Sequence, residues 1–283
     1  MVKALSKRDS EYQRYRNTLV EYIEGYEAMG ATTWIFLDAD KPVGIIAVGQ
    51  EPLMLIEPIG TPASVVNVLE YELPEEDLTD FASLARNISK EANVVYSFID
   101  IPDKYRNFVS SFESVGYHEV AHSLRMRYEI VHEFKASEGL RYEKVERENL
   151  DDFLLIMIEA MSGSPDNILE MILKNIKGAP SQMLDYWYST EKLYLIYHGS
   201  DIVGVLDLSP QSGVNISNMG VMPKFRGRGY GREILCFALL TLSELGITRA
   251  GLRVHVDNKV AIRLYESIGF ERSDSYRALT WRE

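Results

Sequence analysis

The chain has very little cysteine, and only Cys236 could supply a thiol. A single cysteine cannot form an intramolecular disulfide or the thiolate set of a structural zinc site. Cys236 lies inside the apolar run ILCFALL, so we interpret it as a small core residue rather than a nucleophile. The five histidines are scattered without the paired spacing of zinc enzymes, so we expect no metal site.

Long apolar runs and an excess of positive charge are also missing. The polar start of the sequence lacks the apolar segment of a secretory signal, and runs such as IVGVLDL are far shorter than a membrane span. We therefore expect a cytoplasmic protein without membrane contact. The formal net charge of −12 argues against a nucleic-acid partner, which usually requires a basic face. An acidic surface would suit a cationic amine, although solubility explains this charge equally well.

The 283 residues are enough for two domains, and the two halves of the sequence resemble each other. Phe112-Glu-Ser-Val-Gly-Tyr117 matches Tyr265-Glu-Ser-Ile-Gly-Phe270, and each match follows an apolar strand and precedes a final strand. The spacing is that of a domain duplication rather than a solenoid repeat. We predict domains at residues 1–134 and 140–283, joined by a polar linker within residues 132–139.

Periodicity predicts alternating helices and strands in both halves. The first half is predicted to contain a helix that ends at Gly30, a hairpin over 32–50, a strand over 53–59, a helix over 74–92, a strand over 93–100, a helix over 103–116 and a strand over 117–130. The second half is predicted to contain a strand, two helices over 148–178, three strands over 191–223, a helix over 232–246, a strand over 249–257, a helix over 258–269 and a closing strand.

A loop rich in glycine and arginine joins the strand that ends at Pro223 to the helix that follows. Its glycines, Gly227, Gly229 and Gly231, allow backbone N–H groups to approach a ligand closely. Those N–H groups and the first turn of the helix form an anion site. Arginine adds donors suited to phosphate oxygens, here from Arg226, Arg228 and Arg232. The loop therefore predicts pyrophosphate binding.

Other phosphate-binding loops fit this sequence less well. The glycines are spaced G-x-G-x-G rather than in the dinucleotide pattern G-x-G-x-x-G, and no acidic ribose-binding residue is clearly placed after the next strand. The nucleotide P-loop pattern G-x-x-x-x-G-K-[ST] is absent. A nucleotide-binding protein is therefore disfavoured.

The loop resembles motif A of the GNAT superfamily of N-acetyltransferases, whose signature [Q/R]-x-x-G-x-[G/A] is filled by Arg226, Gly229 and Gly231. The resemblance implies that the preceding strand pairs with the pantetheine of acetyl-CoA through Met219, Gly220 and Val221. It also implies that the loop amides bind the pyrophosphate. The predicted loop contacts are Arg226, Gly227, Arg228, Gly229, Tyr230, Gly231 and Arg232.

A second segment, residues 252–270, resembles motif B of the same family. The matching residues are Asn258, Ala261, Leu264, Tyr265, Gly269 and Phe270. The resemblance implies that Asn258 contacts the cofactor arm near Ala261, and that Tyr265 lies near the thioester sulfur. Both motifs stand in the family's order, and together the resemblance covers about residues 140–283.

The implied chemistry is direct attack of an amine on the thioester. Tyr265 would act as general acid toward the departing thiolate, and the N–H of Val221 would polarise the carbonyl. The base is less clear, because the strand Val214–Met219 has no carboxylate. Asp207 on the neighbouring strand is one candidate. A water held by a polar residue of the strand is another, with Asn215, Ser217 and Asn218 as the possible holders, and an amine of lowered pKa needs no strong base.

We therefore predict an α/β protein of two tandem GNAT-like domains, each a mixed twisted sheet flanked by helices. The first is a degenerate copy, because its counterpart of the loop, Leu55–Ser64, has one glycine and no arginine, and Phe112 replaces the tyrosine. The second would transfer acetyl from acetyl-CoA to a primary amine of a small molecule or peptide, in a monomer or homodimer. The alternative is an acyl-CoA-binding sensor without turnover.

Overall fold

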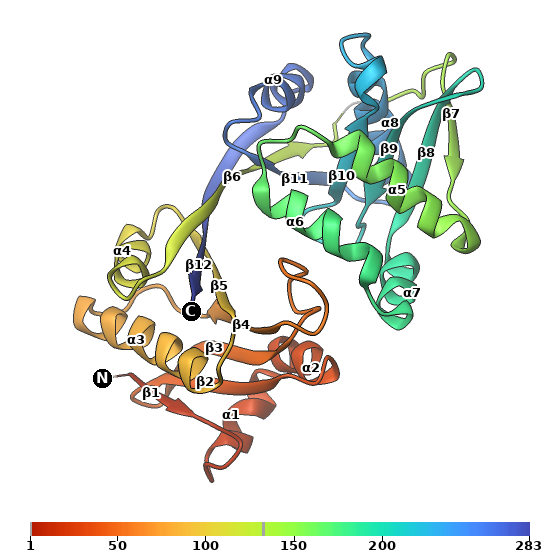
Figure 1. The fold of residues 1–283 in the computed structure, drawn as a ribbon. Helices are drawn as coiled ribbons and strands as arrows, with labels where there is room; N and C mark the ends of the chain where they lie inside the picture. Colours follow the sequence, from red (N-terminus) through yellow and green to blue (C-terminus); the bar gives the residue numbers. More distant parts are fainter. Residues whose placement is uncertain (1, 132–133) are drawn as a thin grey trace. The chain divides into compact units, whose positions relative to one another are not determined.

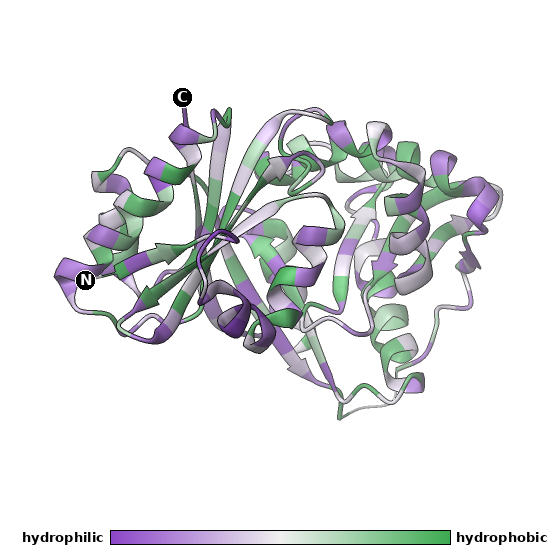
Figure 2. Cartoon of the chain, turned by 90° about the horizontal axis from the view of Figure 1, so that it is seen from below, coloured by the Kyte–Doolittle hydropathy of each residue, from purple (hydrophilic) through white to green (hydrophobic). Residues whose placement is uncertain are grey.

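The computed structural model describes residues 2–131 and 134–283. Contacts divide the chain into two units, unit 1 with Met1–His122 and Ser275–Glu283, and unit 2 with Ser123–Asp274 (Figure 1). Each unit is a mixed sheet covered by helices, so the predicted α/β class is confirmed. The helices carry both hydrophilic and hydrophobic residues (Figure 2), as expected where one face of a helix packs on a sheet. No helix in the described ranges is long and apolar enough to cross a membrane.

The sheet of unit 1 is antiparallel except where β4 lies parallel to β5. In spatial order its strands are β1 (Val2–Leu5), β2 (Thr32–Asp38), β3 (Lys41–Gln50), β4 (Pro62–Val68), β5 (Tyr96–Pro102) and the end of β12 (Glu271–Arg282). Its helices are α1 (Tyr12–Thr18), α2 (Val20–Ala28), α3 (Glu75–Glu91) and α4 (Arg106–Ser114). Separate apolar clusters form around Phe81 and around Ile23, so both faces of this sheet are covered.

The sheet of unit 2 follows the same plan, with β10 parallel to β11 and its other neighbours antiparallel. In spatial order its strands are the end of β6 (His118–Glu129), β11 (Arg249–His255), β10 (Ile216–Val221), β9 (Asp201–Leu208), β8 (Lys192–His198) and β7 (Arg141–Lys144). Its helices are α5 (Leu150–Met161), α6 (Asn167–Asn175), α7 (Ser181–Thr190), α8 (Tyr230–Glu244) and α9 (Lys259–Ile268).

Helices α5 and α8 cover opposite faces of this second sheet. A Cβ placed on Gly220 would lie 2.9 Å from the Ala160 carbonyl oxygen of α5, whereas one on Gly204 would lie 2.7 Å from Ile234 Cδ1 of α8. Gly204 is registered with Val221, the residue after Gly220, and successive residues of a strand point to opposite faces. We call these two sides the α5 face and the α8 face.

The two repeats exchange their last strands. β6 closes the first repeat, yet its residues Ser123–Glu129 pair with β11 in unit 2. β12 closes the second repeat, yet its residues Tyr276–Arg282 pair with β5 in unit 1. The contact units therefore differ from the predicted domains, 1–134 and 140–283, which stay a prediction about the two repeats. The predicted linker begins at residues 132–133, outside the described ranges, and residues 134–140 contain no helix or strand.

The first repeat departs from prediction in its middle. The strand predicted over residues 53–59 is wrong, because this segment bends around the buried Glu51 carboxylate, which accepts the N–H groups of Met54, Leu55 and Glu57. The strand at this place in the order is β4, Pro62–Val68. The predicted counterpart of the glycine–arginine loop, Leu55–Ser64, is therefore also wrong. The segment between β4 and α3, residues 69–74, holds that position.

Candidate functional site

The glycine–arginine loop leaves β10 through a 3₁₀ turn, Pro223–Phe225, and enters α8 at Tyr230. Gly227 and Gly229 have φ angles of 77° and 91°, in the left-handed region that favours glycine. The first N–H groups of a helix have no partner inside the helix. The N–H groups of residues 227–231 have no hydrogen-bond partner within the described part of the chain. The loop therefore presents a row of free donors at the positive end of α8.

The third glycine has a different role. Cβ atoms on Gly227 and Gly229 would meet nothing within 4 Å, so the space beside the loop is open. A Cβ on Gly231 would lie 3.2 Å from Leu264 Cδ2 of α9. Gly231 therefore allows α8 and α9 to approach, whereas the first two glycines supply the backbone conformation.

The three predicted arginines differ in what they contact. Arg226 donates from Nε to the Val221 carbonyl oxygen at 3.1 Å and from Nη2 to those of Ala160 and Ser162, at 3.1 Å and 2.8 Å. It therefore ties the loop to the end of α5. Arg232 donates to Ser267 Oγ at 3.1 Å. Arg228 is exposed, and its guanidinium lies 5.3 Å from the Phe225 ring, so it is the arginine best placed to meet a ligand.

Strands β10 and β11 separate toward the loop. Only Ile216 and Leu252 are registered between them, and β10 has an irregularity between Ile216 and Asn218. Beyond that point β10 pairs with β9 alone, through Val221. The edge of Met219–Val221 that faces β11 therefore lacks a partner among the described strands. A strand edge of this kind can pair with an extended ligand.

Helix α9 brings the motif B residues to the same unit. The Asn258 side chain caps this helix by accepting the Ala261 N–H at 3.2 Å. Tyr265 is 7% exposed, and its hydroxyl has no hydrogen bond in the described part of the chain. Burial raises the pKa of Tyr265 to about 12, so the phenol keeps its proton at neutral pH and can donate it.

Asp207 is buried, and its carboxyl group lies near that of the half-buried Glu191. Asp207 Oδ2 accepts from Asn218 Nδ2 at 2.8 Å, and Glu191 Oε1 accepts from the Ser209 hydroxyl at 2.7 Å. The remaining oxygens, Asp207 Oδ1 and Glu191 Oε2, are buried and have no hydrogen-bond partner among the described residues. Burial raises the pKa of both acids, and their mutual repulsion raises that of Asp207 further. The pair is suited to share a proton.

The other polar residues near β10 and β11 have different surroundings. Asn215 accepts the Gly251 N–H at 3.1 Å and donates to the Ser212 carbonyl, so its amide fastens β10 to β11. Ser217 is exposed, and His255 accepts the Asp257 N–H at 3.2 Å. Asn218 lies between Asp207 and the open part of β10, and its Oδ1 is left as an acceptor. Sequence reasoning missed Glu191, which no pattern marks as a partner of Asp207.

The aromatic cluster at residues 186–188 lies on α7, a helix that was not predicted. Tyr186 is exposed, Tyr188 donates to the Val145 carbonyl oxygen at 3.2 Å, and the Trp187 ring centroid is 6.5 Å from that of Phe153. Two of the three rings therefore contribute to packing.

Comparisons with known proteins agree with this geometry. The acetyltransferase (GNAT) family model matches residues 166–270, which include the loop, Asp207 and Tyr265. A mycothiol acetyltransferase of Propionibacterium freudenreichii is 27% identical over 154 residues, 52% of this chain and 48% of that protein. One of Streptomyces scabiei is 27% identical over 117 residues, 40% of this chain and 36% of that protein. The chain thus spans about half or less of the length of these relatives.

Solved structures show the same fold. A GCN5-related N-acetyltransferase from Sphaerobacter thermophilus has a TM-score of 0.62 and 15% identity, covering 88% of this chain and 80% of that one. A tandem GNAT protein from the clavulanic acid biosynthesis pathway has a TM-score of 0.55 and 12% identity, covering 89% and 82%. Residues 166–270 therefore match the acetyltransferase (GNAT) family, and the fold of the chain is similar to that of a tandem GNAT protein.

Proposed function

We propose that this chain transfers the acetyl group of acetyl-CoA to a primary amine, using its C-terminal repeat. The observation that carries the proposal is the separation of β10 from β11 beside the row of free N–H groups at the start of α8. An extended thioester arm and its pyrophosphate need these two features next to each other. The family match over residues 166–270 supports the same activity.

We assign cofactor binding to three groups of residues. The N–H groups of residues 227–231 and the Arg228 guanidinium would hold the pyrophosphate. The free edge of Met219–Val221 would pair with the pantetheine arm. The Asn258 side chain has its Oδ1 engaged with Ala261, so it would contact the arm through Nδ2. Arg226 serves as a positioning residue, since it anchors the loop to α5.

The chemical step needs a donor for the departing thiolate and an acceptor for the ammonium proton. Tyr265 is the proposed acid, and the N–H of Val221 would polarise the thioester carbonyl. Asp207 is only 1% exposed, so we propose that it acts through Asn218. Its hydrogen bond fixes the Asn218 amide so that Oδ1 can hold a water beside the amine, and that water passes the ammonium proton on to solvent. Asp207 and Glu191 are then positioning residues that hold a proton within the fold.

The acceptor we propose is a small-molecule or peptide amine. Two of the similar proteins are named mycothiol acetyltransferases, and that name supports small-molecule acetylation here without identifying the acceptor. The order of elements differs between the two repeats at residues 150–190, because α7 has no counterpart among the described elements of the first repeat. We therefore expect this segment to contribute to acceptor selection.

A second candidate function is an acyl-CoA sensor without turnover. It is favoured by one observation: β10, residues 216–221, carries no carboxylate. Release of free thiol from acetyl-CoA, measured with a panel of primary amines, separates the two. We expect amine-dependent thiol release that disappears in a Gly229→Val variant. Saturable acetyl-CoA binding with no amine-dependent thiol release would favour the sensor instead.

A further inference from the structure

Strands β6 and β11 present a basic face inside an acidic protein. Arg125 is registered with Arg253, and Glu129 with Arg249, so each pair of side chains shares a face of the sheet. Like charges directly opposite each other destabilise an antiparallel pair. The chain carries a net charge of −12, so general composition does not explain two arginines at one register position.

This basic face is the α5 face. Ile216 is registered with both Leu208 and Leu252, and Leu208 lies on the same side of β9 as Gly204, which faces α8. Leu252 therefore faces α8, and its neighbours on β11, Gly251 and Arg253, face the other way. Asp207 and Asn218, registered with each other next to Leu206 and Met219, also lie on the α5 face.

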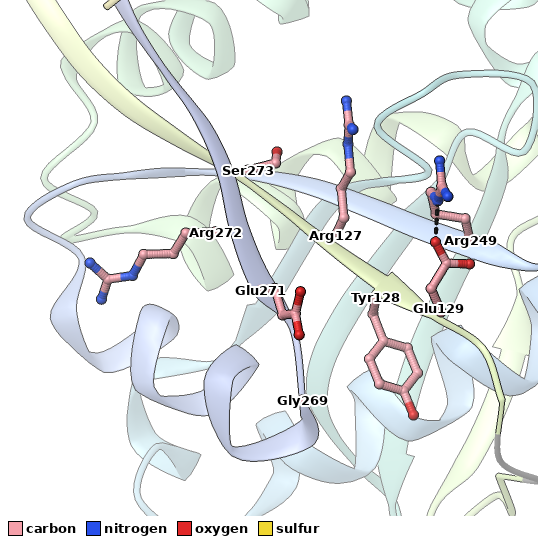
Figure 3. Close-up of a pocket in the computed structure, with 8 residues that line it drawn as sticks. All are labelled: Arg127, Tyr128, Glu129, Arg249, Gly269, Glu271, Arg272 and Ser273. Carbon is pink, nitrogen blue, oxygen red and sulfur yellow. Dashed lines mark hydrogen bonds and ion pairs between the residues drawn. The ribbon is translucent and has the colours of Figure 1, made fainter. Parts of the chain in front are cut away.

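The arginines of this face differ in their partners. Arg249 forms an ion pair with Glu129, shown dashed in Figure 3, and Arg253 donates to Ser123 Oγ at 2.5 Å. Arg127 Nη2 lies 3.9 Å from Asp274 Oδ2. The Arg125 guanidinium has no hydrogen bond or ion pair among the described residues, and its Nε is buried without a partner. Arg125 is half-buried, so an anion beside its guanidinium would supply the partner that the described part of the chain does not.

A cavity of about 250 Å³ lies beside Arg125. Arg127, Arg249 and Asn215 line it as well, and a Cβ on Gly213 would come within 2.7 Å of Arg125 Nη2. A neighbouring pocket of about 430 Å³ shares Arg127 and Arg249, and Figure 3 shows Arg127 pointing away from Tyr128. Planar guanidinium groups facing a small cavity suit a carboxylate or a phosphate.

The cavity lies within reach of the proposed reaction centre. Asn215 lines it at the closed end of the β10–β11 separation, and Met219 follows four residues later. A strand rises roughly 3.3 Å per residue, so the two positions are roughly 13 Å apart along β10. An extended acceptor on the α5 face could therefore span the distance from the cavity to the thioester.

We propose that the Arg125 cavity binds an anionic group, a carboxylate or a phosphate, of the acceptor amine. The identity of the ligand as the acceptor rests on the proposed acetyl transfer. Anion binding at this cavity does not depend on turnover. The exchange of β6 would then matter for function, because Arg125 belongs to the first repeat but lies in unit 2. The first repeat would then supply a specificity residue to the catalytic unit.

Binding is tested without turnover by following the Arg125 Nε–H signal in the NMR spectrum of the full chain. Arg125→Gln assigns that signal, and Arg8→Gln, at an exposed arginine of unit 1, is the matched control. Inorganic phosphate and acetate are titrated separately, with and without coenzyme A to occupy the loop. We expect a saturable shift of this signal with at least one of the two anions. The anion that binds more tightly shows whether the site prefers a carboxylate or a phosphate. No shift with either anion would overturn the proposal, even if acetyl transfer is observed.

Specificity is tested with 11-aminoundecanoate and its methyl ester, which are long enough to span the roughly 13 Å from the cavity and differ in the anionic charge. We expect the acid to have the higher kcat/KM, and Arg125→Gln to lower that of the acid about tenfold or more while leaving that of the ester unchanged. Gly213→Ala, which crowds the guanidinium, should give the same pattern to a smaller degree. Equal losses for acid and ester would mean that Arg125 only supports the fold. Anion binding without any acetylation would instead reject the proposed function and leave the site in place.

Discussion

The two repeats have the same order of elements, yet they differ where an acyl-CoA arm would lie. In the second repeat β10 and β11 share one registered position, Ile216 with Leu252. In the first repeat the corresponding strands, β4 and β5, stay paired over four positions, from Ala63 with Tyr96 to Val66 with Ile99. The pairing of β4 with β5 therefore leaves no free strand edge at the corresponding place. Continuous strand pairing thus closes, in the first repeat, the strand edge that the second repeat leaves open.

The loops that follow these strands differ in charge as well as in shape. Residues 69–74 of the first repeat contain Glu70, paired with Lys41, and Tyr71, whose ring stacks 4.3 Å from that of Tyr105. The first turn of α3 is acidic, with Glu75, Glu76 and Asp77. Carboxylates there complement the helix dipole from within the chain and would repel a pyrophosphate. The second repeat instead offers free N–H groups and Arg228.

The largest expected effect comes from the loop itself. Gly229→Val should lower acetyl-CoA affinity by at least about 100-fold, because it strains a left-handed residue and puts a side chain beside the N–H donors. Gly246→Val is the matched control, since Gly246 has a φ of 78° and open space at the other end of α8. Calorimetry measures both variants. Equal affinity losses would show that general strain, rather than the loop, controls binding.

The next effect concerns the tyrosine that the first repeat lacks. Tyr265→Phe should keep acetyl-CoA binding and slow turnover by about 10²–10⁴-fold, as expected for loss of a general acid. Tyr117→Phe is the control in the first repeat, where a buried tyrosine hydroxyl donates to Ser97 Oγ at 2.7 Å. That variant should lower the melting temperature but not the rate per folded molecule. A Tyr265→Phe variant with wild-type turnover would leave this residue with a packing role only.

The smallest expected effect is a pH dependence of stability in the second repeat. Burial raises the pKa of Asp207 from 3.8 to about 8, so the folded chain retains a proton that the unfolded chain releases. The contribution of this proton to the folding stability is fully present below about pH 4 and is lost as the pH rises toward about 8. The melting temperature of the wild type should therefore fall relative to that of Asp207→Asn across this range, by on the order of 5 °C.

Asp201→Asn, at an exposed position on the same strand, is the control for that measurement. Its melting temperature should follow the wild type at every pH. Parallel melting curves for wild type and Asp207→Asn would mean that Asp207 and Glu191 do not hold a proton in the fold.

Much of the second repeat could be predicted because its signals are local. The glycine–arginine loop, the cap at Asn258 and the closing Tyr265–Phe270 segment each lie within a short stretch, and local patterns determine how such stretches fold. The roles predicted for the loop residues remain predictions. Arg226 illustrates the difference, since the sequence places it in the loop but does not reveal its bonds to Ala160 and Ser162.

What could not be predicted depends on distant partners. The segment after Glu51 is apolar enough for a strand, but the buried Glu51 carboxylate takes its N–H groups instead. β6 and β12 have strand patterns that fit either sheet, so periodicity cannot reveal their exchange. Glu191 meets Asp207 only after α7, β8 and β9 have folded. Arg125 alternates with Arg127 along β6, a period-two basic pattern that could have suggested a ligand face.

The central claim is that one repeat binds acetyl-CoA and the other does not. Calorimetric titration of the full chain with acetyl-CoA tests it most directly, with Gly229→Val measured alongside. We predict saturation at one site per chain, and loss of that site in the variant. Two sites in the wild type, or a site that survives in Gly229→Val, would contradict the account.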